Sequence, residues 1–236
     1  MDIEHHYVER GSGEPLILLH GNGEDSSFFS WQMDPLSEHF RVIALDTRGH
    51  GRTPRGDAPF TIRQFADDLL AFMDRLGIAK AHLLGFSDGG NIAMVFALKY
   101  PERVGRLILN GANLDPSGVK WNVQLPIEIG YRIAKHLAKR RPDAKKHAEI
   151  LGLMVNDPMV KPEELSGIQA PTLVIAGKRD MIKESHTRLI AKSIPHARLT
   201  ILPGNHFVAS CNPMLFSKAV LAFLMNDQES CADQVS

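Results

Sequence analysis

The sequence predicts an α/β protein built on a mostly parallel sheet that helices cover on both faces. Two observations support this fold class: short apolar runs rich in Leu, Ile and Val recur along the chain, and helix-like stretches separate them. The runs are continuous rather than alternating, which is typical of strands buried on both faces. Strands that alternate with helices form parallel sheets. The expected strands are residues 16–19, 42–45, 82–84, 107–109, 173–176 and 199–202.

Three of the intervening helices are clearly marked. The first covers residues 61–76, where Thr61 can cap the start, apolar residues recur at helical spacing and Gly77 ends the helix. The second covers 91–100 and stops before a proline, which disfavours helical backbone in the preceding residue. The third covers 213–224 and closes the domain.

Residues 113–165 interrupt the alternation, because their patterning is helical and they contain no strand-like run. We expect helices over 131–141 and 144–154 within this segment. We interpret the segment as a small helical cap, inserted into a core domain formed by residues 1–112 and 166–236.

The predicted cap contains a cluster of basic side chains. Seven basic residues are opposed by one acid, Asp143, which leaves a local excess of six positive charges. The basic residues are Arg132, Lys135, Lys139, Arg140, Arg141, Lys145 and Lys146. The cluster is either the solvated outer face of the cap helices or a surface that recruits an anionic substrate.

Composition excludes several classes of protein. The 236 residues are 44% hydrophobic and 23% charged, as in ordinary globular proteins, which rules out a disordered or fibrous chain. Lys+Arg and Asp+Glu both number 27, so the chain lacks the broad positive field that binding to nucleic acid or to a membrane surface needs. We therefore expect neither partner.

The cellular location is also constrained. The first residues are acidic and lead into no apolar segment, so we expect no secretory signal. No apolar run approaches the roughly 18 residues of a membrane span. Two cysteines, Cys211 and Cys231, are too few for a disulfide framework. We expect a soluble protein of the reducing cytoplasm.

Residues 85–90 (Gly-Phe-Ser-Asp-Gly-Gly) match the pattern G-x-S-x-G, with a predicted strand before them and a helix after them. In this pattern the serine occupies a strained turn, and the glycines are needed because a side chain at either flank would collide with neighbouring backbone. The turn exposes Ser87 at a helix N-terminus, which favours the negative charge that develops in acyl transfer. We predict that Ser87 is a nucleophile.

A serine hydroxyl is too weakly acidic to attack a carbonyl unaided, so it needs a base, and the base needs an orienting carboxylate. Asp180 follows one predicted strand through a short turn, and His206 follows the next. With Ser87, all three lie past the carboxyl ends of parallel strands, the edge where open α/β sheets build their sites.

At these residues the chain resembles the α/β-hydrolase family, and the resemblance covers nearly its whole length. Four segments carry the resemblance: 20–23 (His-Gly-Asn-Gly), 46–51 (Asp-Thr-Arg-Gly-His-Gly), 85–90, and 203–206 (Pro-Gly-Asn-His). The family implies that Ser87 is the nucleophile, His206 the general base and then acid, and Asp180 the orienting acid. Asp115 is the alternative acid, since some members place the carboxylate after the preceding strand.

The resemblance also implies an oxyanion hole and an apolar pocket. The amide of Asp88 is one expected oxyanion donor and the amide of Asn22 the other, with Gly23 as the alternative. The family's cap closes over the catalytic edge, although several apolar residues there could equally pack between cap helices. The expected lining is Leu114, Trp121, Val123, Ile127, Ile129, Tyr131, Met154 and Met159 from the cap, with Phe86 beside the nucleophile and Phe207 beside the base.

No metal or cofactor is expected. The His, Asp and Glu residues show no metal-ligand spacing, and the proposed chemistry requires no cofactor. Residues 21–26 imitate a dinucleotide fingerprint, but Ser26 replaces the third glycine and the following helix starts late, which misplaces the phosphate-binding helix N-terminus.

The sequence therefore predicts a serine hydrolase that cleaves a carboxylic ester of a small, largely apolar molecule through an acyl-enzyme on Ser87. Family members use the same apparatus on thioesters, lactones, amides and carbon-carbon bonds and in perhydrolysis, and the sequence does not separate these reactions. The alternative from another class is a non-catalytic ligand receptor that keeps the fold.

Overall fold

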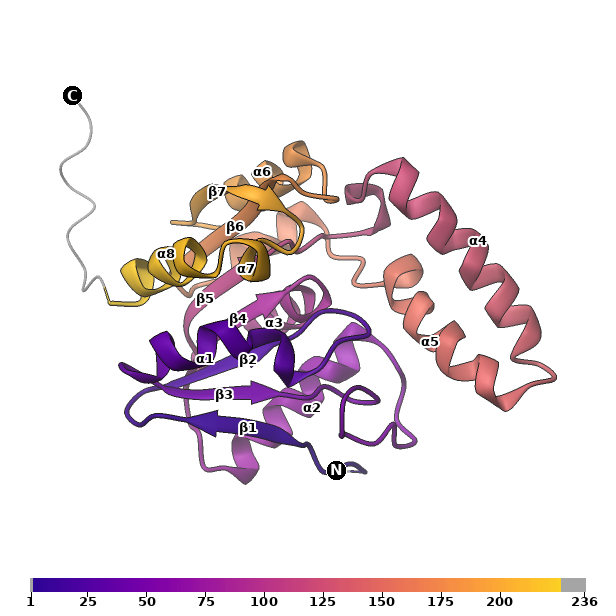
Figure 1. The fold of residues 1–236 in the computed structure, drawn as a ribbon, viewed down its shortest axis with the longest axis horizontal. Coiled ribbons are helices and arrows are strands. Elements are labelled where there is room, and N and C mark those ends of the chain that lie inside the picture. The colour runs from indigo at the N-terminus through magenta and orange to yellow at the C-terminus, as the bar shows by residue number, and fades with distance from the viewer. Residues whose placement is uncertain (1, 226–236) are drawn as a thin grey trace.

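A computed structural model describes residues 2–225, apart from the side chains of residues 142 and 143 (Figure 1). Seven strands form one sheet in the order β1-β3-β2-β4-β5-β6-β7. Every neighbouring pair is parallel except β1 with β3. The strands are β1 (Tyr7–Arg10), β2 (Pro15–Leu19), β3 (Arg41–Leu45), β4 (Ala81–Phe86), β5 (Val104–Asn110), β6 (Thr172–Arg179) and β7 (Arg198–Asn205).

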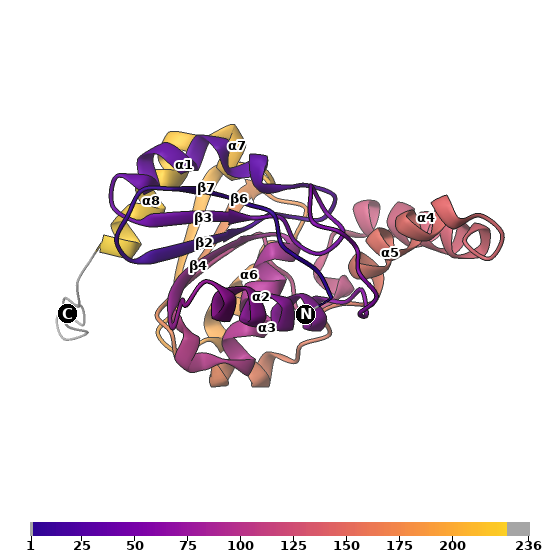
Figure 2. The same cartoon turned by 90° about the horizontal axis from the view of Figure 1, so that it is seen from below.

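Helices cover both faces of the sheet, which confirms the predicted fold class. Figure 2 shows α1, α7 and α8 on one face and α2, α3 and α6 on the other. The α-helices are α1 (Ser30–Ser37), α2 (Ile62–Arg75), α3 (Asp88–Lys99), α4 (Trp121–Leu137), α5 (Pro142–Asn156), α6 (Glu184–Ser193), α7 (Val208–Cys211) and α8 (Pro213–Met225). Short 3-10 turns are η1 (Ser26–Phe29), η2 (Pro101–Arg103), η3 (Pro116–Gly118) and η4 (Pro162–Gly167).

Strand β2 shows why the apolar runs are continuous. Its buried residues alternate between two hydrophobic cores, so that Leu16 and Leu18 pack under α1 and α8 while Ile17 and Leu19 pack under α2 and α3. A strand with a core on each side needs apolar side chains at every position. Strand β1 escaped prediction because it lies at the sheet edge and most of its side chains are exposed.

The helix signals in the sequence have visible counterparts. The Thr61 hydroxyl accepts a hydrogen bond from the Gln64 N–H at 3.2 Å and so caps α2, and Gly77 follows the helix with a φ of 64°. Helix α3 begins at Asp88, three residues before the expected start at 91, because Gly89 and Gly90 are helical here.

Between β5 and β6 the chain forms two long helices, which we call the α4–α5 hairpin (Trp121–Leu137 and Pro142–Asn156). Figures 1 and 2 show it projecting from the rest of the molecule, with α5 next to the core and α4 outermost. Helix α4 starts well before the expected position 131, because Pro126 lies within the helix and does not end it.

Two expectations involve parts of the chain outside the described residues: the thiol of Cys231 and the side chain of Asp143. Within residues 2–225, no helix is both long enough and apolar enough to cross a bilayer.

Candidate active site

Ser87 occupies the sharp turn between β4 and α3. Its φ is 52°, a left-handed conformation that is unusual for a residue with a side chain, and its N–H donates to the Asn110 carbonyl at 2.8 Å. Both flanking glycines are forced by contact with backbone. A Cβ on Gly85 would lie 2.2 Å from the Gly89 carbonyl oxygen, and one on Gly89 would lie 2.0 Å from the Leu19 carbonyl oxygen. The turn can therefore form only with glycine at both positions.

The structure brings Ser87, His206 and Asp180 together. His206 Nε2 lies 3.1 Å from Ser87 Oγ, and His206 Nδ1 lies 2.7 Å from Asp180 Oδ1. Because a carboxylate accepts hydrogen bonds, Nδ1 is the donor to Asp180, which leaves the Nε2 lone pair directed at the serine hydroxyl. His206 and Asp180 are both 4% exposed, so the hydrogen bond between them is shielded from water, whereas Ser87 is only half-buried.

Strands β6 and β7 position the acid and the base. Asp180 directly follows β6 and His206 directly follows β7, and the two strands are paired in parallel up to Arg179 and Asn205. The Asp180 carboxylate also accepts from the Ile182 N–H at 2.9 Å, which fixes its orientation toward the imidazole.

Asp115, the alternative acid, has another role. Its Oδ1 accepts from the Ser117 N–H at 2.7 Å, so it caps the 3-10 turn η3. Asp180 rather than Asp115 contacts His206.

The two expected oxyanion amides lie in the loop after β2 and at the start of α3. Among the described residues, neither the Asn22 N–H nor the Asp88 N–H donates to another protein group. The neighbouring Gly21 N–H, in contrast, is bound to Glu24 Oε2 at 3.0 Å. The Asn22 side chain donates to the Ile150 carbonyl of α5 at 2.8 Å, which connects this loop to the α4–α5 hairpin.

Two acids beside the site, the half-buried Glu24 and the buried Asp88, were not predicted. Burial raises the pKa of Glu24 to about 7, and burial reinforced by the charge of Asp157 raises the pKa of Asp88 to about 7. Asp88 Oδ1 accepts from Asn91 Nδ2 at 3.3 Å, whereas its Oδ2 is buried with no partner among the described residues. No sequence pattern predicts the raised pKa values of these two carboxyl groups, because the shifts depend on burial in the folded protein.

Aromatic rings surround the imidazole, as the sequence suggested. The Phe86 ring centroid lies 4.9 Å from that of His206, and Phe86 stacks on Phe28 at 4.4 Å. The Phe207 ring lies 5.5 Å from His206 and is 44% exposed.

The predicted lining from the hairpin divides into two groups. Ile127, Tyr131 and Met154 are half-buried, and Tyr131 packs against α5 close to Gly152. Trp121 and Ile129 are instead 75% and 50% exposed, so they do not line an enclosed pocket. The direction in which each side chain leaves the helix explains the difference. Ile127 and Tyr131 lie on the side of α4 that packs against α5, whereas Trp121 and Ile129 lie on the outer side.

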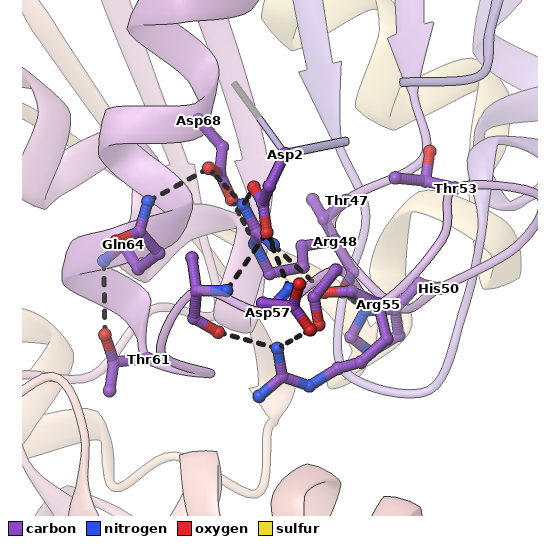
Figure 3. Close-up of polar contacts among 12 residues, drawn as sticks. Asp2, Thr47, Arg48, His50, Thr53, Arg55, Asp57, Thr61, Gln64 and Asp68 are labelled. Carbon is purple, nitrogen blue, oxygen red and sulfur yellow. Dashed lines mark hydrogen bonds and ion pairs between the residues drawn. The ribbon is translucent and has the colours of Figure 1, made fainter. Parts of the chain in front are cut away.

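Loop residues of the family pattern hold the site's surroundings together. His20 Nδ1–H donates to the Gly21 carbonyl at 2.7 Å, and His20 Nε2 accepts from the Thr47 N–H at 3.1 Å. Figure 3 shows the buried Arg48 guanidinium between the carboxylates of Asp68 and Asp2, with both Asp68 bonds at 2.7 Å. These contacts are structural, and they fix the loop after β3.

Gly111 was missed by the sequence reasoning. It follows β5 with a φ of 63°, and a Cβ there would lie 2.8 Å from His206 Cε1. The residue therefore makes room for the imidazole, and a glycine directly after a predicted strand is its only sequence signal.

Within the described residues, no group of three or more His, Cys, Asp or Glu side chains is arranged to hold a metal ion. Hydrogen-bonded Ser, His and Asp side chains at the carboxyl edge of a mostly parallel sheet, with the serine on a strained turn, define a hydrolase of the α/β class.

Comparisons with known proteins agree. A family model described as alpha/beta hydrolase fold matches residues 14–128. The chain belongs to the α/β-hydrolase family. A protein of Caulobacter sp. strain K31 named as the carbamate hydrolase RutD is 30% identical over an alignment 261 positions long, which covers 96% of this chain and 97% of the relative.

Two solved structures are similar over nearly the whole chain. The enol-lactonase from Burkholderia xenovorans LB400 has a TM-score of 0.80 and 27% identity, covering 95% of this chain and 97% of the other. A mutant of the meta-cleavage product hydrolase CumD from Pseudomonas fluorescens IP01 has a TM-score of 0.79 and 25% identity, with 94% of each chain covered.

Proposed function

We propose that this hydrolase cleaves a carboxylic ester of a small, largely apolar molecule through an acyl-enzyme on Ser87. The observation that carries the proposal is the chain of hydrogen bonds from Ser87 Oγ to His206 Nε2 at 3.1 Å and from His206 Nδ1 to Asp180 at 2.7 Å. A nucleophile, a base and an orienting carboxylate in this order are what acyl transfer to a serine requires.

The reaction proceeds in two halves. Ser87 Oγ attacks the ester carbonyl carbon while His206 Nε2 takes the hydroxyl proton, and the collapsing intermediate expels the alcohol, which receives that proton. Water then attacks the acyl-enzyme as His206 takes its proton, and the acid leaves when the proton returns to Ser87 Oγ. Asp180 holds the imidazole in orientation and stabilises its positive charge in both halves.

In this mechanism the amides of Asn22 and Asp88 stabilise the oxyanion of each tetrahedral intermediate. Their N–H groups have no protein acceptor among the described residues, and the Asp88 amide lies at the N-terminus of α3, where the helix dipole favours negative charge. One oxyanion donor typically contributes about 3 kcal/mol to lowering the barrier.

The α4–α5 hairpin acts as the cap in this proposal, and residues 113–165 form the inserted unit. Two contacts support a position over the site: Asn22 binds the Ile150 carbonyl at 2.8 Å, and Arg55 pairs with Glu149 at 2.9 Å. A cap held over the site excludes water from the acyl group, and the rings of Phe86 and Phe207 favour apolar substrates.

A carbamate is the second candidate substrate, because several relatives are named as carbamate hydrolases. Ser87 would attack the carbonyl carbon of a carbamate as it attacks that of an ester, but the nitrogen attached to the carbamate carbonyl makes this carbon less electrophilic. Cleavage of thioesters, lactones, amides or carbon-carbon bonds would use the same three residues. Perhydrolysis, in which hydrogen peroxide takes the place of water as the acyl acceptor, would use them as well.

The decisive experiment compares Ser87→Ala with wild type on p-nitrophenyl acetate. We expect the variant to lose turnover while its circular dichroism spectrum stays unchanged. Ser166→Ala is the matched control, since Ser166 is exposed on η4 and its hydroxyl only donates to the Glu163 carbonyl. Turnover at the wild-type rate in Ser87→Ala would refute the proposal.

Two further measurements separate the alternatives. A fluorophosphonate probe should label wild type at Ser87, whereas an inert but folded protein would indicate a ligand receptor. p-Nitrophenyl acetate and p-nitrophenyl N-methylcarbamate share a leaving group, so the ratio of their kcat/KM values compares ester with carbamate directly. A ratio that favours the carbamate would replace the ester in the proposal.

A further inference from the structure

Helix α4 carries a row of exposed apolar side chains. Five large hydrophobic residues occur four positions apart and are between 42% and 75% exposed. They are Trp121, Leu125, Ile129, Ile133 and Leu137, which we call the α4 stripe. Scattered exposed apolar residues are common on soluble proteins, but a continuous apolar row usually marks a binding surface.

The α4 stripe faces away from the protein. A step of four residues turns a helix by about 40°, so the stripe is a continuous band that winds by about 160° around α4 from Trp121 to Leu137. The buried side chains of α4, Gln124 and Ala134, lie on the opposite side, where the helix packs against α5. Figures 1 and 2 show α4 as the outermost element, with nothing over its outer side. The 17-residue helix presents a band roughly 25 Å long.

Positive charges border the stripe. All seven basic residues of the cluster named above, from Arg132 to Lys146, are exposed, and none of them forms an ion pair with a described acid. Of the hairpin acids whose side chains the structure describes, Glu149 pairs with Arg55 and Glu128 accepts from Gln124 at 3.3 Å. Arg132 lies on the same side of α4 as the stripe, and Arg140 follows the helix in the turn that leads to α5. Lys135 instead lies over the Tyr131 ring, and Lys146 is close enough to His50 to help lower the pKa of that imidazole. The surface is therefore apolar along its length and cationic at its C-terminal end.

We propose that the α4 stripe and the basic cluster bind the surface of an anionic lipid bilayer. An amphipathic helix lies in a bilayer interface with its apolar side chains among the acyl chains and its lysines and arginines at anionic headgroups. The α4 stripe would insert among the acyl chains, and the basic cluster would bind the anionic headgroups. The long side chains of Arg132 and Arg140 can reach from the band to the headgroups.

Charge disfavours the competing partners. A second copy of the chain that paired its stripe in parallel with this one would bring the two cationic clusters together, and an antiparallel pairing would set each cluster against the apolar Trp121 end of the other helix, where the described acid Glu128 is already hydrogen-bonded to Gln124. A nucleic acid would satisfy the cations but leave the apolar band in water. A lipid surface satisfies both.

This inference revises the expectation that the chain has no membrane partner. That expectation came from the zero net charge of the whole chain, which averages over the local excess on the hairpin. The inference is independent of the proposed reaction, since it involves none of the residues around Ser87.

The test is co-sedimentation of the full chain with vesicles at low salt. We expect binding to phosphatidylcholine vesicles that contain phosphatidylglycerol and little binding to phosphatidylcholine alone. In about 1 M salt, where the screening length is about 3 Å, binding should weaken by tenfold or more. Ile129→Asn with Ile133→Asn should weaken binding roughly tenfold or more, and Arg140→Gln with Arg141→Gln about thirtyfold.

The matched control is Met214→Asn with Leu215→Asn, which removes two exposed apolar residues from α8, away from the hairpin. This variant should bind as wild type does. Failure of wild type to bind anionic vesicles would overturn the proposal, as would equal losses in the control and stripe variants. Light scattering that shows a wild-type dimer dissociated by the stripe substitutions, without vesicle binding, would assign the surface to a second copy instead. Because the vesicle comparison uses wild type, it decides the matter even if a variant misfolds.

Discussion

Replacing Asp88 by asparagine should stabilise the protein, and more so at high pH. The Asp88 carboxyl is buried beside the nucleophile, one of its oxygens has no partner among the described residues, and its pKa is raised to about 7. An asparagine has the same shape, can still accept the hydrogen bond from Asn91, and carries no charge at any pH. The substitution removes the ionisation and places an amide N–H₂ group where the unpartnered Oδ2 lies, a cost that does not change with pH.

The size of the effect follows from the shift in the Asp88 pKa, from an ordinary 3.8 to about 7. One pKa unit corresponds to about 1.4 kcal/mol, so ionising this carboxyl in the folded protein costs about 4 kcal/mol. The folded state binds the proton more tightly than the unfolded chain, so stability falls as pH rises from about 4 to about 7 and is level above that range. Between about pH 5 and pH 8 the advantage of Asp88→Asn over wild type should grow by about 2 to 3 kcal/mol.

Urea unfolding followed by circular dichroism, at several pH values, measures this difference. Comparing the variant with wild type at each pH cancels the contributions of other titrating groups. Asp57→Asn is the matched control, because the same chemical change at an exposed position should not reproduce the gain with pH. An advantage of Asp88→Asn that stays constant from pH 5 to 8, or that shrinks, would show that the buried carboxyl does not titrate as argued.

Three further substitutions test the architecture. Gly89→Ala should destabilise the protein by about 3 kcal/mol in urea unfolding and abolish hydrolysis of p-nitrophenyl acetate, since its Cβ would lie 2.0 Å from the Leu19 carbonyl oxygen. Arg48→Leu should cost about 3 to 5 kcal/mol in the same assay, because it leaves the buried Asp68 carboxylate unpaired; a change below about 1 kcal/mol would contradict this reasoning. Asp180→Asn should lower kcat about 10⁴-fold with the fold intact, because an amide that donates to Nδ1 favours the wrong imidazole tautomer; an unchanged kcat would remove Asp180 from the mechanism.

The fold and the three hydrogen-bonded side chains were predictable because their signals are local. Continuous apolar runs identify strands with a core on each side, and Thr61 and Gly77 mark the ends of α2. Ser87 is identified by the glycines that its turn requires. Asp180 and His206 are identified by their positions after strands, since parallel strands bring their carboxyl ends to one edge.

The features that escaped prediction depend on tertiary contacts. The raised pKa values of Glu24 and Asp88 arise from burial, which no short motif encodes. Gly111 is needed because His206, far away in the sequence, packs against it. The outward direction of Trp121 depends on the point at which α4 begins, and Pro126 obscured that point in the sequence.

Helix α5 is tied to the loop after β2 by the Asn22–Ile150 hydrogen bond and to the loop after β3 by the Arg55–Glu149 ion pair. If the hairpin lifts to admit a substrate, both ties break, and the loop with the Asn22 amide loses its support from above. Closure would then restore the oxyanion donor and exclude water in one movement. Under that coupling, a substrate bound beneath a raised hairpin would not react until the hairpin closed. A higher solvent viscosity, which slows the movement of the hairpin, would then slow turnover as well.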